Sequence, residues 1–494
     1  MTGQRSRLGN GAHIAAALLL ALSTAIQSTA RAAQDGFHAQ PGLGFTKGDH
    51  QVLVPIEFRY RWENWQAFAP ESSDFHGIRT RVALDYRFKD KLRLFAQAQQ
   101  SAVVGLSATA SGVGGLYRSN NGNQDNPSSV RPSQIFAQFD AAQGSWIRAG
   151  RSYINMGTEV GYKEANWQYL KSKRQAQRLV GSVGWSNGAR SNDGLASRVA
   201  IGRQVLHVFL AQPTTGVVVV DNEAYKSNDG ILFGGLDWTA PRGVLLDNTE
   251  LGAFFIGYSD TRDPAEVAGL FGDIEVYTLG GSMLGVYPVG KGRVDTLLWG
   301  AFQFGEYADQ GPTTGVQNRD QLAGALVAEI GYQRTDLWAK PWLRLGVNWA
   351  SGDGNLDDED RNTFFNALPT NHLYYGYADQ LAFQNLTDLL LQLKLTPMDK
   401  LGVEITYHRF WLDDSADFRW AGTGAFSRTN LGFARGASNG STDVGQELDI
   451  LVTYPVNQWL SVLGGYSKLW GGDVFATTPN SDVDFAYLQL QIKY

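Results

Sequence analysis

The sequence predicts an all-β protein, a transmembrane antiparallel β-barrel of about 18 strands (range 16–20) preceded by a cleaved signal peptide. Three observations lead to this prediction. The chain starts with an export signal, its strand-like segments alternate apolar and polar residues, and short connections alternate with long ones. No stretch after the signal approaches the roughly 18 apolar residues of a membrane-spanning helix.

Residues 1–32 have the three parts of a secretory signal peptide. Arg5 and Arg7 form a basic start, and an Ala- and Leu-rich run from Ile14 to Ile26 follows. Ala30-Arg31-Ala32 supplies the small-x-small pattern of a cleavage site. The apolar run is too short to span a bilayer, so cleavage is favoured over a membrane anchor.

After the signal we expect a short periplasmic segment over 33–51 and the barrel over 52–494. The full chain carries a net charge of −6, and residues 1–32 contain three Arg and no acid, so the mature chain carries −9. Charged residues make up 18% of the chain, below the roughly 25% of soluble domains. The mean hydropathy of −0.24 argues against a helical membrane protein. Cysteine is absent, which excludes disulfides and thiol chemistry.

Alternation with a period of two residues marks strands along the chain. It begins at Ile56, where apolar and charged residues alternate as far as Glu63. It is clearest on both sides of the short turns at 397–400 and 455–458. In the middle of the chain we expect strands near 176–186, 197–211, 230–240, 249–259, 274–287, 293–306, 321–333 and 338–350.

The last strand has apolar residues at every second position and ends on an aromatic residue. This pattern resembles the terminal signal that the barrel-insertion machinery reads in bacterial outer-membrane barrels. We therefore expect an assembly signal and a location in the cell outer membrane, with lipid around the wall. The signal residues are Leu488, Leu490, Ile492 and Tyr494.

Loop lengths support this topology. Turns near 89–91 and 141–144, and the two turns already named, are short, whereas connections near 103–130, 351–384 and 412–444 are long. Outer-membrane barrels have short periplasmic turns and long extracellular loops. With both chain ends in the periplasm, every short turn falls on the periplasmic side. We expect no plug domain before the wall.

Strand parity places many charged residues on the face opposite the apolar one, toward a lumen. A barrel of 16–18 strands leaves an aqueous channel, whose lining sets selectivity. One interpretation is an electropositive, anion-selecting pore; the other is that the charges pair across strands and only solvate the lumen. The basic candidates are Arg59, Arg61, Arg79, Arg81, Arg87, Arg93, Arg148, Arg344 and Lys394, and the acidic ones are Glu57, Asp85, Glu404, Glu447 and Asp449.

An acidic stretch over residues 353–360 raises the question of calcium, which prefers oxygen ligands. The EF-hand loop needs Gly at its sixth position and Glu at its twelfth, where this chain has Asp358 and Phe364. A solvated acidic loop is therefore favoured, and we expect neither a metal nor a cofactor. The weak calcium candidates are Asp353, Asp357, Asp358 and Asp360.

Several patches of the sequence are similar to the alginate export family of outer-membrane channels. The first are Trp146–Arg151 with Ala165–Trp167, Tyr407–Trp411 with Asp413 and Asp414, and Gly445–Asp449. A further set, Ser351–Asp353 with Leu368–His372 and Tyr374–Gly376, is similar to a subgroup of that family. The patches are fairly specific together and weak singly.

The resemblance implies a monomeric barrel of about 18 strands with an arginine-rich constriction that passes an acidic polysaccharide outward. It carries Arg148 and Arg151 over as constriction residues and Glu447 and Asp449 as acidic lumen partners. Parity supports Arg148 but breaks at Gly150, where a bulge would turn Arg151 inward. The loop over 351–384 departs from the alginate exporter itself, which puts the substrate in doubt.

The leading functional hypothesis is a passive, arginine-lined channel that exports an anionic polysaccharide such as alginate. The alternatives are a general or sugar-specific porin for small solutes and, behind both, an outer-membrane hydrolase. We expect no enzyme, because no residue constellation meets the requirements of a catalytic site. The expected partners are the polysaccharide or a small anionic solute, with periplasmic export proteins as further candidates and no nucleic acid.

Overall fold

The computed structural model describes residues 38–39, 43–221, 223–366, 368–423 and 434–494. The predicted signal peptide lies outside the described residues. Among these residues, no helix is both long enough and apolar enough to cross a membrane.

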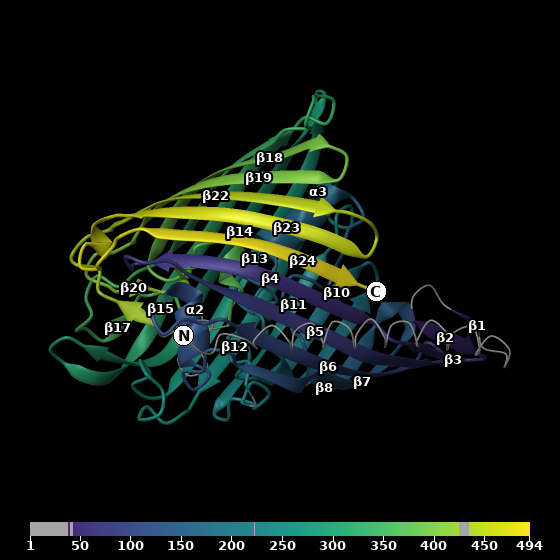
Figure 1. Ribbon diagram of the computed structural model, residues 1–494, viewed down its shortest axis with the longest axis horizontal. Coiled ribbons are helices and arrows are strands. Elements are labelled where there is room, and N and C mark those ends of the chain that lie inside the picture. The colour runs from purple at the N-terminus through teal and green to yellow at the C-terminus, as the bar shows by residue number, and fades with distance from the viewer. Residues whose placement is uncertain (1–37, 40–42, 222, 367, 424–433) are drawn as a thin grey trace, which may run out of the picture.

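The wall is a closed ring of 18 strands, each antiparallel to both neighbours (Figure 1). The predicted fold class is thereby confirmed. The ring consists of β4 (Ile56–Ala67), β5 (Ser73–Phe88), β6 (Leu92–Val104), β7 (Ser128–Asp140), β8 (Trp146–Ser152), β9 (Asn192–Ile201), β10 (Gln204–Pro213), β11 (Ile231–Ala240), β12 (Thr249–Asp260), β13 (Ile274–Val289), β14 (Gly292–Gly311), β15 (Gly315–Gln333), β16 (Trp342–Ala350), β18 (Leu386–Met398), β19 (Leu401–Trp411), β22 (Asp443–Pro455), β23 (Leu460–Gly471) and β24 (Val483–Lys493).

The ring closes between its last and first strands. β24 pairs with β4, and the backbones of Ile56 and Tyr494 exchange hydrogen bonds of 2.9 and 2.8 Å. The predicted signal residues Leu488, Leu490 and Ile492 point outward from this seam. The aromatic ring of Tyr494 lies 5.9 Å from that of Trp459, in the neighbouring short turn.

Short elements decorate the ring. Three short strands continue the sheet at one end of β5. They are β1 (His38–Ala39), β2 (Gly44–Lys47) and β3 (His50–Leu53). The end of β5 that extends past β4 pairs with β3, which in turn pairs with β2, and β2 pairs with β1. The loops carry β17 (Asp360–Arg361), the pair β20 (Arg419–Trp420) and β21 (Arg435–Gly436), the helices α2 (Gly112–Ser119) and α3 (Ala165–Tyr169), the π-helical turn η3 (Leu170–Gln175), and the 3-10 turns η2 (Ala142–Gly144), η4 (Asn371–Leu373) and η6 (Asp473–Phe475).

Burial follows strand parity as a barrel in lipid requires. On β18, Leu391 is 46% exposed on the outward face, whereas the adjacent Gln392 is 1% exposed on the inward face. On β24, Leu490 points outward and Gln489 is buried inside. Apolar side chains therefore form the outer surface, and polar ones line the lumen.

Two of the strands expected in the middle of the chain are wrong. The segment 197–211 is a hairpin of β9 and β10 with a tight turn at Gly202-Arg203, where Gly202 has a φ of +62°. The segment 176–186 is part of the loop between β8 and β9. Its apolar residues, among them Val180 and Val183, are buried inside the barrel and not in the wall. The errors cancel in the strand count.

Two long loops, over 153–191 and 351–385, fold into the ring. The first loop bonds inward-facing side chains on three separate wall strands, through Lys171 to β12, Arg174 to β15 and Tyr169 to β18. Only a segment inside the ring reaches all of these strands. The second loop pairs with the first, since the N–H of Gly181 donates to the carbonyl of Leu368 at 2.8 Å. The expected extracellular loop at 351–384 therefore fills part of the lumen.

The register gives a testable consequence for the wall. Leu391→Arg places a charge in the apolar outer band and should lower the free energy of unfolding by about 2–4 kcal/mol. Gln491→Arg, on the inward face of β24 beside a cavity, should cost far less. Reversible denaturant titration of the barrel in lipid vesicles measures both. Equal costs for the two variants would show that the faces are assigned incorrectly.

Candidate functional site

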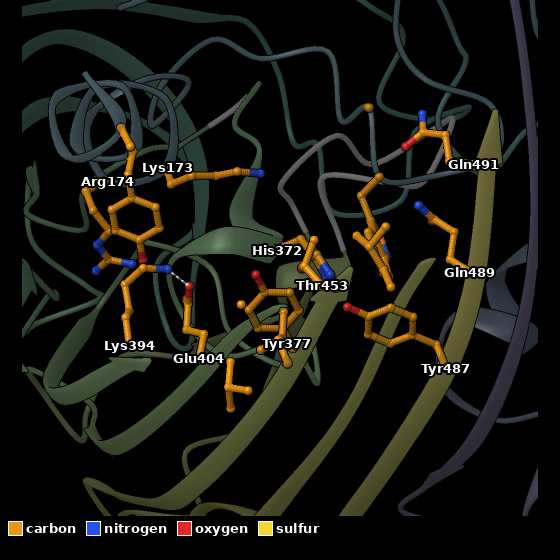
Figure 2. A pocket seen from close by; sticks show the side chains of 18 of the residues that line it. Lys173, Arg174, His372, Tyr377, Lys394, Glu404, Thr453, Tyr487, Gln489 and Gln491 are labelled. Atoms are coloured by element: carbon orange, nitrogen blue, oxygen red, sulfur yellow. Dashed lines mark hydrogen bonds and ion pairs between the residues drawn. The ribbon is translucent and has the colours of Figure 1, made fainter. Parts of the chain in front are cut away.

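A cavity of about 740 Å³ lies inside the barrel, between the two inner loops and the wall strands on either side of the β4–β24 seam (Figure 2). Lys340, Thr396 and Gly402 line it, and all three lie in or beside the short turns. The cavity is therefore at the short-turn end of the lumen, which is the periplasmic end in outer-membrane barrels.

The lining of the cavity is strongly basic. It contains eight Arg and Lys residues but two acidic residues, a formal excess of six positive charges. The acidic residues are Glu57 and Glu404. The basic residues are Arg59, Arg79, Arg81, Lys173, Arg174, Lys340, Lys394 and Lys493. Low-dielectric walls around a cleft of one charge sign focus its field and raise the local concentration of counter-ions.

The arginines of β4 and β5 both line the cavity and hold the 153–191 loop. Arg59 donates to the carbonyls of Gly184 (3.1 Å) and Ser186 (2.7 Å). Arg79 donates to the same two carbonyls, at 2.9 and 3.0 Å, and forms an ion pair with Glu57 at 2.7 Å. Arg81 lies 3.6 Å from the same carboxylate. Glu57 is thus the shared counter-charge of Arg79 and Arg81, so this group of residues has a net positive charge.

On the opposite wall, Lys394 of β18 pairs with Glu404 of β19, as the dashed line in Figure 2 marks. The Lys394 ammonium also lies 3.7 Å from the centre of the Tyr169 ring, on the inner loop. Lys173 extends from that loop into the space between these groups and Tyr487. Within the described part of the chain, Lys173 has no hydrogen-bond or ion-pair partner.

A buried carboxylate holds the inner loop beside the cavity. Glu329 of β15 contacts three guanidinium groups, those of Arg174 (2.8 Å), Arg178 (3.4 Å) and Arg344 (2.8 Å). Arg344, a predicted pore residue, also pairs with Asp295 at 3.0 Å. Arg344 is thus a fully buried structural counter-charge and does not line the cavity.

Other predicted site residues lie away from the cavity. Arg93 makes a two-point contact with Asp85, at 2.8 and 2.9 Å. Arg148 points inward, donates to Gln138 and stacks over Phe136 at 4.2 Å. Neither arginine belongs to the cavity lining.

Arg151 does not turn inward at Gly150 as expected. The ladder continues without a register shift, so Arg151 is opposite Ile135 and shares its outward face. There it forms a two-point ion pair with Asp193, at 2.7 and 2.6 Å.

The acidic candidates Glu447 and Asp449 are buried on the inward face of β22. Glu447 accepts a hydrogen bond from the Ala378 N–H at 2.8 Å and so anchors the 351–385 loop. Asp449 lies 3.7 Å from Nε2 of His408. Neither carboxylate lines the cavity.

The weak calcium candidates have separate partners. Asp357 accepts hydrogen bonds from Thr313 and Thr314, while Asp358 accepts the N–H of Asp360. In the ranges that the structure covers, no three His, Cys, Asp or Glu side chains gather around a possible metal position. Asp353 is buried beside Asp417, whose pKa burial raises to about 6.

Two stretches match the G-x-S-x-G pattern of serine hydrolases, Gly184–Gly188 and Gly436–Gly440. The Ser186 hydroxyl donates to the Val183 carbonyl at 3.1 Å, and the Ser438 hydroxyl donates to the Ser415 carbonyl at 2.6 Å. Each hydroxyl is committed to backbone, which a nucleophile paired with a histidine base would not be.

Sequence reasoning missed Lys173, Arg174, Lys340 and Lys493 as lining residues. Parity arguments apply to strands, whereas Lys173 and Arg174 come from a loop and Lys340 from a turn. A usable signal was present, since Lys171, Lys173, Arg174 and Arg178 place four basic residues within eight positions. Such density at and just before the strand expected over 176–186 is a warning that this segment is not part of the wall.

A closed barrel with an apolar outer band and a polar, charged lumen defines an outer-membrane channel. The family model for alginate export matches residues 51–489, and the chain belongs to this family. Alginate production protein AlgE of Azotobacter vinelandii is 24% identical over 180 residues. That match covers 34% of each chain, so this chain spans about a third of the length of the curated relative it matches.

Solved structures share the fold. OccAB1 of Acinetobacter baumannii has a TM-score of 0.59 at 10% identity, covering 90% of this chain and 96% of that one. OpdK of Pseudomonas aeruginosa, solved with vanillate, has a TM-score of 0.53 at 11% identity, covering 89% and 98%. The protein is thus an outer-membrane β-barrel that shares its fold with these structures.

The Glu329 cluster predicts a large effect on stability. Glu329→Gln leaves three guanidinium groups short of a counter-charge and should lower the free energy of unfolding by about 3–5 kcal/mol. Asp336→Asn removes an exposed partner of Arg334 in a short turn and should cost little, because exposed ion pairs are screened by solvent. Denaturant titration monitored by heat-modifiable gel migration compares the two. A similar small loss in both variants would mean that Glu329 does not hold the inner loop.

Proposed function

We propose that this channel passes anionic solutes, above all an acidic polysaccharide, and that the basic cavity is where the carboxylates are attracted. The observation that carries the proposal is the excess of six positive charges around the cavity. Membership of the alginate export family supports a carboxylated polymer as the cargo.

The chemistry of the lining suits passage of such a cargo. A carboxylate that enters a narrow lumen loses hydration, and guanidinium and ammonium groups replace it with charge-assisted hydrogen bonds. Conduction requires contacts that are individually weak and repeated along the path, since a single tight site would retain the polymer. Eight basic side chains spread over both walls and the inner loop meet that requirement. Entry at the short-turn end corresponds to loading from the periplasm.

A second candidate, a channel for small anions, is favoured by the size of the cavity. The two inner loops leave a space of about 740 Å³, which accommodates a small carboxylate more readily than a continuous polymer. OpdK, solved with vanillate, shares the fold, but at 11% identity the likeness concerns the fold alone. For a polymer to pass, the inner loops have to move aside.

Reversal potentials across a planar bilayer test the selectivity. The wild-type channel should prefer chloride to potassium, because its lining is positive. Arg79→Gln/Arg81→Gln should reduce that preference several-fold, whereas Arg151→Gln, on the outward face, should leave it unchanged. High salt should weaken the preference in all of them, since the Debye length is about 8 Å at physiological ionic strength. A cation-selective wild-type channel would refute the proposal.

Block by oligomers separates the two candidates. If the cargo is a polysaccharide, uronate oligomers added on the periplasmic side should block the current with a dwell time that grows with chain length. Neutral oligosaccharides of equal length serve as the control. Block by monomeric uronate that does not strengthen with length would favour the small-anion channel.

A further inference from the structure

The π-helical turn η3 lies inside the barrel and carries three basic residues within four positions, Lys171, Lys173 and Arg174. Its wide geometry is evident where the N–H of Ala176 donates to the Lys171 carbonyl at 3.0 Å. π-helical turns are rare and are frequently found at functional sites. The three cations of this turn have different surroundings, which suggests different tasks.

Two of the three cations anchor the turn to different strands of the wall, β12 and β15. Lys171 lies between Glu250 of β12 (2.6 Å) and Glu159 of its own loop (3.0 Å), and all three groups are buried. Arg174 makes its ion pair with Glu329 of β15. A buried pair of this kind is costly to break, because the remaining charge is left uncompensated. The turn is therefore held at both ends.

Lys173 lies between these anchors, and its side chain is exposed to the cavity (Figure 2). The acid across the cavity, Glu404, already forms an ion pair with Lys394. The charges of Lys171 and Arg174 are therefore neutralised by buried carboxylates. The charge of Lys173 remains available to a solute that enters the cavity.

We propose that Lys173 is the specificity-determining residue of the channel, binding the carboxylate of an anionic sugar, and that the anchored π-turn holds it in the path. This inference rests on the proposed anion transport and names the residue that performs it. An ammonium group suits this task because it is a compact point charge on a flexible stem, without the rigid two-point geometry of guanidinium. It therefore attracts a carboxylate and releases it readily, as a transport path requires.

The absence of cysteine from the chain allows a test on the folded protein. Lys173→Cys is purified, reconstituted in a planar bilayer and treated from the periplasmic side with thiol reagents that attach either an ammonium or a sulfonate group. Lys340→Cys, at a short turn that lines the same cavity, is the matched control. Because the charge is added after folding, a change reports on conduction and not on assembly.

We expect Lys173→Cys to lose several-fold of the anion preference and of the block by uronate oligomers. The ammonium reagent should restore both, and the sulfonate reagent should reduce both further. The same treatments of Lys340→Cys should change both in the same direction but by a clearly smaller factor, because Lys340 adds only to the general positive potential of the cavity. Lys173→Arg should keep the anion preference but lengthen each blocking event, because guanidinium binds carboxylates at two points.

The outcomes distinguish this inference from the proposal on which it rests. An anion-selective wild-type channel in which Lys173→Cys and both of its modified forms behave as wild type would overturn the role of Lys173 and leave the proposed transport standing. Equal effects at Lys340 would also overturn it, because the charge would then act through the general potential of the cavity. A wild-type channel without anion preference would remove the proposed function itself.

Discussion

The hydrogen-bonding demand of a backbone in lipid is the constraint on which the rest of this structure depends. Hydrocarbon offers no partner to an N–H or C=O group, so a sheet can cross a membrane only when it closes on itself. Here the closure is the pairing of β24 with β4. Because each strand alternates its side chains, closure also sorts them, with apolar residues toward lipid and polar residues toward the lumen.

The sorting concentrates charge in the lumen, and the molecule balances most of it internally. Glu329 alone contacts three arginines, and Glu250 holds Lys171. Most of these contacts join the wall to the 153–191 loop, so charges that would make an empty pore highly polar instead fix this loop inside it. Specific placement of a loop, more than added stability, is the best account of so many buried pairs.

The proposed function depends on the place in the lumen where positive charges outnumber their counter-charges. Around the cavity at the short-turn end, the lining holds eight cations and two carboxylates, and although Arg174 also pairs with Glu329 behind the lining, positive charge is left over. The family match and the fold explain why a channel is present. The uneven distribution of counter-charges is the basis of the proposal that its cargo is anionic. The acid that gives the chain its net negative charge lies elsewhere, for example in the loop at 353–360.

The sequence by itself determined the barrel and the faces of most strands, because period-two alternation is a local property of each segment. Leu391 and Arg79 were assigned to the correct faces in this way. The best estimate of the strand number was right only because two errors cancelled. The sequence also pointed to the family. Only the tertiary structure decided which charges remain available. Arg344 forms ion pairs with two buried carboxylates, and Arg151 faces outward. Lys173, by contrast, lines the cavity and comes from a loop. Pairing depends on residues more than a hundred positions apart, such as Arg174 and Glu329, and strand parity contains no information on how a loop folds back into the lumen.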